Sequence, residues 1–141
     1  MNRLVLMKLG VGLVTAALVY GCQSVGGGLS DEELINCTMT DWKAALIAQD
    51  LDKVMAAYSE DYASTRGGKD SVREFMTNVF EQGYMENTKV NLGSAETAIV
   101  EDKAEFGPVE FISDMGTFRL EYVLQKEDEA WLIVGSRMVE Q

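Results

Sequence analysis

Apolar residues along the chain follow two spacings, and the change falls near residue 86. Before that point they recur every three or four positions, which is typical of amphipathic helices. Three such stripes predict three helices: Ile35, Met39, Trp42 and Leu46; Leu51, Val54, Met55 and Tyr58; and Val72, Phe75, Met76, Val79 and Phe80. After that point the spacing falls to two, which is typical of strands.

The predicted helices have recognisable ends. Residues 30 to 33 read Ser-Asp-Glu-Glu, which fits a capping box in which the serine and the third helical residue satisfy each other's backbone N–H groups. Asp50 is placed to cap the second helix, and Gly83 to close the third. We therefore expect the first helix to run from residue 31 to about Gln49 and the second to end at residues 59 to 61.

The alternating part of the chain predicts four or more antiparallel strands. The clearest carries Phe118, Leu120, Tyr122 and Leu124 on one face, and earlier ones carry Thr88, Val90, Leu92, Ala104, Phe106 and Phe111. Gly107-Pro108 predicts a bulge or an edge position, because proline cannot donate to a strand ladder. Residues 126 to 129 predict a hairpin turn before a last strand over 131 to 139. The order predicts an α+β domain with three N-terminal helices packed on a curved antiparallel sheet.

Composition limits the functions open to this chain. Its 141 residues, 47% of them hydrophobic, suffice for one domain with a real core. The formal net charge of −11 disfavours a nucleic-acid partner, because phosphate binding needs basic groups. Histidine is absent, which removes Ser-His-Asp catalysis and histidine-ligated metal sites. We expect no metal and no cofactor.

The N-terminus has the layout of a secretory signal, with Arg3 and Lys8 ahead of an uncharged apolar run. A transmembrane span competes, but the run up to Cys22 is shorter than the ~20 apolar residues that a bilayer requires. The sequence Leu-Val-Tyr-Gly-Cys, residues 18 to 22, resembles the lipobox of bacterial lipoproteins.

The lipobox resemblance implies that residues 1 to 21 are a signal peptide and that Cys22 carries a diacylglyceryl thioether. Residues 22 to 29 then form a glycine-rich tether, and the domain spans residues 30 to 141. Removing the signal takes away two basic residues and no acidic one, so the net charge becomes −13. The protein would lie in the cell envelope, with Gln23 after the cysteine implying the periplasmic face of the outer membrane. In that arrangement Cys37 is expected to be a buried structural thiol.

Three segments together resemble the nuclear-transport-factor-2-like, SnoaL-like superfamily: residues 41 to 62, the glycine turn before the third helix, and residues 124 to 134. The resemblance covers roughly residues 31 to 140 and implies a cone, or cystatin-like, fold. Its members include ketosteroid isomerases, cyclases, association domains and many lipoproteins, and homodimers packed sheet against sheet are common. We therefore expect a homodimer through the strand face that bears Arg119, Glu121 and Val123.

When the motifs of this superfamily are matched to this sequence position by position, the known catalytic residues have no counterparts. The oxyanion tyrosine of the ketosteroid isomerases corresponds to Trp42, and their catalytic base falls near Thr65 or Arg66, neither of which is a carboxylate. The dehydratases of the fold use histidine, which is absent. An enzyme is therefore the alternative, a lyase or isomerase with Asp61 or Asp41 as the carboxylate and Trp42 or a tyrosine as the donor.

Aromatic residues are expected to line the cone, either as core packing or as a pocket for a small apolar ligand. The pocket candidates are Trp42, Tyr58, Tyr62, Phe75, Phe80, Phe111, Phe118, Tyr122 and Trp131. Arg66 and Lys69 flank two glycines, which permits an anion site but is more typical of a plain turn. The leading prediction is a membrane-anchored domain that binds a small apolar ligand or a partner protein.

Overall fold

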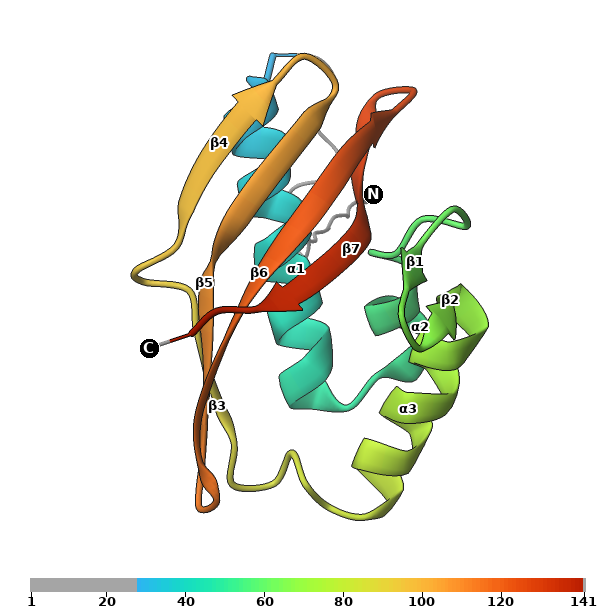
Figure 1. The fold of residues 1–141 in the computed structure, drawn as a ribbon, viewed down its shortest axis with the longest axis vertical. Helices are drawn as coiled ribbons and strands as arrows, with labels where there is room; N and C mark the ends of the chain where they lie inside the picture. The colour runs from blue at the N-terminus through green and yellow to red at the C-terminus, as the bar shows by residue number, and fades with distance from the viewer. Residues whose placement is uncertain (1–27, 141) are drawn as a thin grey trace, which may run out of the picture.

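The computed structural model describes residues 28 to 140 (Figure 1). The predicted signal peptide and Cys22 lie outside these residues. The helices are α1 (Asp31–Ala48), α2 (Leu51–Met55) and α3 (Lys69–Glu81). The strands are β1 (Ala63–Ser64), β2 (Gly67–Gly68), β3 (Lys89–Asn91), β4 (Glu96–Val100), β5 (Lys103–Ser113), β6 (Gly116–Glu127) and β7 (Ala130–Met138). Among the described residues, no helix is long and apolar enough to span a membrane.

The helix starts are those that the sequence predicts. The Ser30 side chain accepts a hydrogen bond from the Glu33 N–H, and the Glu33 carboxylate accepts one from the Ser30 N–H, which completes the capping box. Asp50 caps α2 by accepting from the Lys53 N–H. The second helix ends earlier than expected, because Tyr58 leaves the helical path to form a parallel bridge with Ile133 of β7.

The main sheet is antiparallel and is built around the long strand β5. β5 pairs with β6 and β6 with β7, while β3 and β4 pair with opposite halves of the other edge of β5. The predicted turn over residues 126 to 129 joins β6 to β7. The sequence does not mark β4, because Ala98, Ile99 and Val100 are consecutive apolar residues and hide the alternation.

The predicted irregularity at Gly107-Pro108 is present. The register between β5 and β6 shifts between Phe106 and Val109, which bends β5 where it changes partner from β4 to β3. At Gly107 a Cβ atom would lie 2.9 Å from the Glu121 Cα, so the close approach of the two strands requires glycine. The bulge gives the sheet its curvature.

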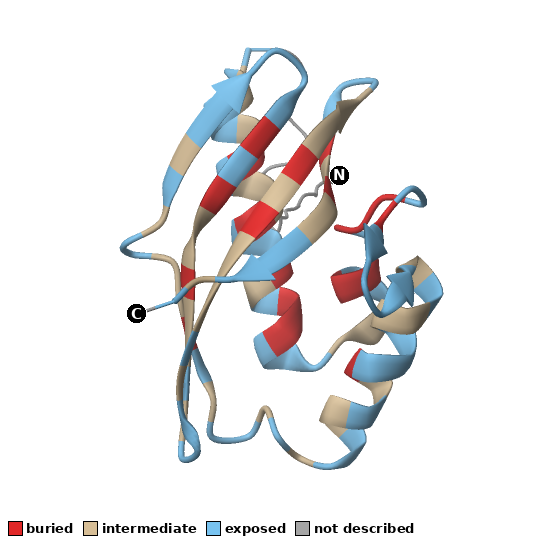
Figure 2. Cartoon of the chain, in the orientation of Figure 1, coloured by how far each residue is buried: buried red, intermediate tan, exposed pale blue. Residues whose placement is uncertain are grey.

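α1 lies against one face of the sheet and runs along it, while α2 and α3 lie to one side (Figure 1). The buried residues form one cluster that joins α1 and α2 to the inward positions of the strands. Figure 2 shows the buried positions alternating along β5 and β6, with their other face more exposed. The interior of the cone is therefore a hydrophobic core between α1 and the sheet.

Candidate functional site

The centre of the cone is occupied by aromatic side chains from four segments. Trp42 of α1 packs edge-on against Tyr122 of β6 at 5.0 Å between ring centroids, and against Phe111 of β5 at 6.1 Å. Tyr58 and Tyr62, in the segment after α2, pack edge to face at 5.4 Å. Trp42, Tyr58, Tyr62 and Tyr122 are all buried. The predicted aromatic interior exists, and these rings fill it.

The polar atoms of this aromatic cluster are only partly satisfied. Trp42 Nε1 is buried and has no acceptor at hydrogen-bonding distance and angle, although the Tyr58 hydroxyl is near enough for the indole to lower the tyrosine pKa. Burial is the larger effect and raises the pKa of Tyr58 above its ordinary range, and burial likewise raises that of Tyr122. The Tyr62 hydroxyl pairs with Ser136 Oγ at 3.2 Å. The hydroxyls of Tyr58 and Tyr122 therefore remain protonated at physiological pH.

Two of the predicted interior residues do not line the cone. Phe75 is 55% exposed, because α3 buries only Met76 fully and holds its other apolar residues partly in solvent. Phe118 is 46% exposed, because it lies near the end of the β5–β6 hairpin. Phe80 and Phe111 are half-buried, and Trp131 is buried.

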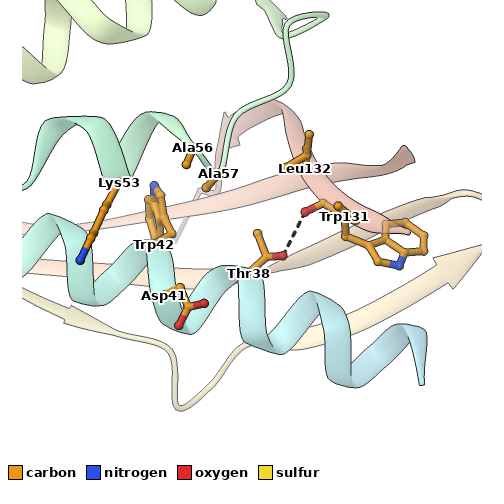
Figure 3. Close-up of a pocket in the computed structure, with 9 residues that line it drawn as sticks. Thr38, Asp41, Trp42, Lys53, Ala56, Ala57, Trp131 and Leu132 are labelled. Atoms are coloured by element: carbon orange, nitrogen blue, oxygen red, sulfur yellow. Dashed lines mark hydrogen bonds between the residues drawn. The ribbon is translucent and has the colours of Figure 1, made fainter. Parts of the chain in front are cut away.

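One hollow borders the aromatic cluster, between α1, α2 and the start of β7, and Trp42 is part of its lining (Figure 3). It holds about 160 Å³, and Asp41 of α1 and Lys53 of α2 stand at its sides. Partial burial raises the pKa of Asp41. Thr38 donates to the Trp131 carbonyl at 3.0 Å across its floor. A second hollow of about 360 Å³ is an open surface along α3 that Glu74, Thr77, Asn78 and Glu81 line.

Asp61 and Trp42, one carboxylate and the donor of the enzyme alternative, are not brought together. Asp61 is exposed, and its backbone N–H donates to the Oγ of Ser59 at 2.9 Å. Trp42, the proposed donor, is buried between α1 and the sheet. A general base and a hydrogen-bond donor must both reach the same substrate. Asp61 therefore does not form an acid–base pair with Trp42. Asp41 and Trp42 both line the hollow of about 160 Å³, but the Asp41 carboxylate and the Trp42 indole nitrogen point in opposite directions (Figure 3).

The other candidate groups have structural roles. Lys69 pairs with Glu60 at 2.9 Å, while Arg66 is exposed in the β1–β2 turn. Among the described residues, no group of three or more acidic or cysteine side chains is close enough to hold a metal ion. Arg66 and Lys69 therefore do not converge on a common point in the turn at residues 66 to 69, as an anion site would require.

Cys37 is not the buried thiol that the sequence predicts. It is half-buried, since a residue two positions from Ile35 points to another side of the helix. It is also disulfide-bonded. The chain has two cysteines, and Cys22 lies outside the described residues. One sulfur cannot form both bonds, so a disulfide within the chain and a thioether lipid on Cys22 exclude each other.

Apolar side chains are exposed at one end of the concave face of the sheet. Strand register places Phe111 opposite Phe118, and Leu120 opposite Met138, in adjacent rows of that face. Phe118 and Met138 are 46% and 62% exposed, and Met115 at the hairpin tip is 79% exposed. We call these five residues the open-end patch. Sequence periodicity assigns Phe118 and Leu120 to the inner face, but it does not reveal that the helices leave this end uncovered.

The convex face of the sheet carries ion pairs within the chain. Arg119 bonds Glu110 at 2.9 Å, and Glu110 also accepts from Asn91 at 2.8 Å. Arg137 pairs with Glu105 at 3.2 Å and with Glu121. The charged groups of the face expected to form a dimer therefore already have partners within their own chain.

Comparisons with known proteins show the fold. The sequence matches no protein-family profile and no curated protein. Solved structures do match. A protein of unknown function with a cystatin-like fold from Nostoc punctiforme is 13% identical, with a TM-score of 0.62 over 78% of this chain and 92% of the other. An NTF-2-like protein of unknown function from Shewanella oneidensis is 16% identical, with a TM-score of 0.62 over 79% of this chain and 100% of the other.

The domain has an NTF2-like, cystatin-like fold. A third similar structure, an NTF2-like protein with a cystatin-like fold from Novosphingobium aromaticivorans, is 15% identical with a TM-score of 0.62 over 77% of this chain and 80% of the other. Identities this low show the fold alone. The function must be argued from this chain's own residues.

Proposed function

We propose that this chain is a cell-envelope lipoprotein whose NTF2-like domain binds a partner protein through the open-end patch. The observation that carries the proposal is the contrast between a filled cone and an exposed concave end. Trp42, Tyr58 and Tyr122 occupy the interior where a small ligand would bind, whereas Phe118 and Met138 lie in solvent on the same face of the sheet. Exposed apolar groups that share one face are typical of interaction surfaces.

The position of the patch suits a tethered protein. α1 begins at one end of the domain, and the β5–β6 hairpin that carries Phe118 lies at the other (Figure 1). The 18 residues of α1 span about 27 Å at the usual helical rise. A lipid anchor ahead of α1 would hold that end near the membrane and direct the open-end patch away from it, toward proteins in the compartment.

Site-specific photo-crosslinking in the native cells tests this proposal. Phe118 is replaced by a photoreactive phenylalanine derivative, and a matched chain carries it at Val100, an exposed apolar residue of the edge strand β4. The proposal expects a discrete crosslinked protein from position 118 and none from position 100. The same products from both positions, or none from either, would exclude the patch as the docking surface.

The anchor rests on the lipobox resemblance, and the disulfide of Cys37 is the competing chemistry for the chain's cysteines. Intact mass separates the two states. A chain that begins at Cys22 and carries a diacylglyceryl group and an acyl chain supports the anchor. A chain two hydrogens lighter than its reduced form, with no added lipid, excludes it.

Small-ligand binding is the second candidate function, and one observation favours it. A buried indole N–H without an acceptor costs free energy, on the order of 1–3 kcal/mol, that a ligand oxygen would recover. Tyr58 and Tyr122 border the same region. Opening of the cone would be required first. A retained small molecule in the native mass spectrum of the wild type, lost in Trp42→Phe, would support this candidate.

A further inference from the structure

One continuous segment of the domain is held in place by very little burial. It runs from residue 63 to residue 88 and contains the β1–β2 hairpin, α3 and the turns that lead to β3. Within this fully described segment Met76 alone is buried, whereas α1 buries five of its 18 residues. Figure 2 shows α3 mostly intermediate and exposed. We call residues 63 to 88 the flap.

The polar contacts of the flap are also weak. The N-terminus of α3 receives no hydrogen bond from a capping side chain, in contrast to those of α1 and α2. Lys69 pairs with Glu60, and Arg73 pairs with Asp52 at 3.5 Å. Both carboxylates are largely exposed, and ion pairs of this kind contribute little to stability. The ladder between β1 and β2 is only two residues long and is exposed.

The flap lies between two fixed points of the chain. Tyr62 before it and Val90 after it are both buried. Inside the flap, Gly67 precedes α3 with a φ of +125° and Gly83 follows α3 with a φ of +76°. Glycine adopts positive and negative φ values with similar ease. The backbone can therefore change its path at both ends of α3 while Tyr62 and Val90 stay in place.

The flap covers one side of the aromatic cluster. The partly buried apolar residues of α3 pack against the buried cluster of the domain. A Cβ at Gly68 would lie 3.3 Å from the Tyr62 carbonyl oxygen, so the backbone at the start of α3 lies against that residue. Tyr62 packs against Tyr58, whose hydroxyl is near the Trp42 indole N–H that lacks an acceptor. Displacement of the flap would therefore uncover the tyrosines next to this N–H.

We propose that the flap opens as one unit, while α1 and the main sheet remain folded, and that it admits a small ligand to the Trp42 N–H. This inference rests on small-ligand binding, the second candidate function, and adds the route by which the filled cone opens. Segments with few buried apolar side chains have the lowest free energies of local opening. The hairpin and α3 move together because β2 runs directly into α3.

Hydrogen exchange measured by mass spectrometry tests the opening in the full chain, held in phosphatidylcholine nanodiscs. After correction for intrinsic exchange rates, we expect the amides of α3 to exchange roughly 100-fold or more faster than the slowest amides of α1 and β6. Equal protection of α3 and α1 would overturn the proposal, because α3 would then open only when the whole domain unfolds.

Three variants separate opening of the flap from unfolding of the domain. Met76→Ala removes the buried side chain of the flap and should speed α3 exchange by roughly tenfold or more. Phe75→Ala, at an exposed position of the same helix, should change that exchange by less than about twofold. Ile35→Val, at a fully buried position of α1, should speed the slowest α1 and β6 amides by roughly two- to tenfold and leave α3 exchange unchanged.

Independent opening of the flap would be refuted by either of two results. One is an Ile35→Val chain in which α3 exchange accelerates as much as α1 exchange does. The other is a Met76→Ala chain in which α3 exchange keeps its wild-type rate.

Acetylation of tyrosine hydroxyls by N-acetylimidazole, located by mass spectrometry, tests the route without any ligand. Tyr58 and Tyr62 should react roughly tenfold faster in Met76→Ala than in the wild type, because their labelling requires the open flap. Tyr84, which is exposed within the flap, should react at the same rate in both chains. Unchanged labelling of Tyr58 and Tyr62 beside faster α3 exchange would refute the route. Failure of the small-ligand function is a separate result, the absence of a retained molecule from the native mass spectrum.

Discussion

The indole N–H of Trp131 donates a hydrogen bond of 3.1 Å to Asp31 Oδ1, across 100 positions of sequence. Lys126 Nζ lies 2.9 Å from the same carboxylate oxygen. The first residue of α1 is thereby joined to the start of β7 and the end of β6. This contact fixes the end of the domain from which the chain continues toward Cys22.

The Asp31 contact predicts a pH dependence of stability. Lys126, and then the Trp131 hydrogen bond, lower the pKa of Asp31 below its usual 3.8. The ionised carboxylate therefore stabilises the fold fully above that pH, and the contribution is lost as the pH falls through the lower folded-state pKa. Urea unfolding of wild type and Asp31→Asn from pH 6 to pH 2.5 should show a stability difference that shrinks on the acid side. A difference that stays constant down to pH 2.5 would refute the contact.

Ser59 predicts a second stability effect. It is fully buried, donates to Glu127 Oε2 at 2.5 Å and accepts from the Asp61 N–H at 2.9 Å. Ser59→Ala removes both hydrogen bonds at a buried position and should cost about 1–3 kcal/mol of unfolding free energy in denaturant titration. Ser64→Ala, at the exposed end of β1, is the matched control and should cost much less. Equal losses from the two variants would contradict the assigned role.

Gly107 predicts a strict steric requirement. Its added Cβ would meet the Glu121 backbone at 2.9 Å, whereas a Cβ at Gly135 would meet nothing closer than 3.9 Å. Gly107→Ala should therefore destabilise the domain by about 1–3 kcal/mol, because neighbouring strands must move apart. Gly135→Ala should remain within about 0.5 kcal/mol of wild type. Thermal unfolding that ranks the two glycines in the opposite order would show that the bulge is packed differently.

Phe118 and Phe106 should respond in opposite ways to truncation, although both lie on the concave side of the sheet. Phe106 is buried, and Phe106→Ala should cost about 3–5 kcal/mol. Phe118 is exposed, and Phe118→Ser should change stability by about 0.5 kcal/mol or less. The same substitution should abolish binding of the partner protein at the open-end patch. A large stability loss in Phe118→Ser would mean that this residue belongs to the core.

Local sequence was sufficient for the starts of the helices and for most of the sheet. Ser30, Asp50 and Gly107 were assigned correctly because capping and strand irregularity depend on residues a few positions apart. β4 was missed because an edge strand with one apolar run carries no alternation. Long-range contacts such as Asp31 with Trp131 have no local signature.

The candidate site was only partly predictable for a related reason. Trp42, Tyr58 and Tyr122 were placed in the interior because helical and strand spacing reports which face a residue occupies. Spacing does not report where a covering helix stops, so Phe75 and Phe118 were placed inside when they are exposed. The filled cone also follows from how the rings pack in three dimensions, which composition does not determine.

Native mass spectrometry of the protein extracted from its own membrane tests the central claim most directly, with Phe118→Ser, Met138→Ser chains beside the wild type. The account predicts a wild-type chain that begins at Cys22, carries lipid and retains a second protein, and a variant that keeps the lipid but loses that protein. A second protein that the variant retains as well as the wild type does, or an unlipidated chain alone in both samples, would contradict it.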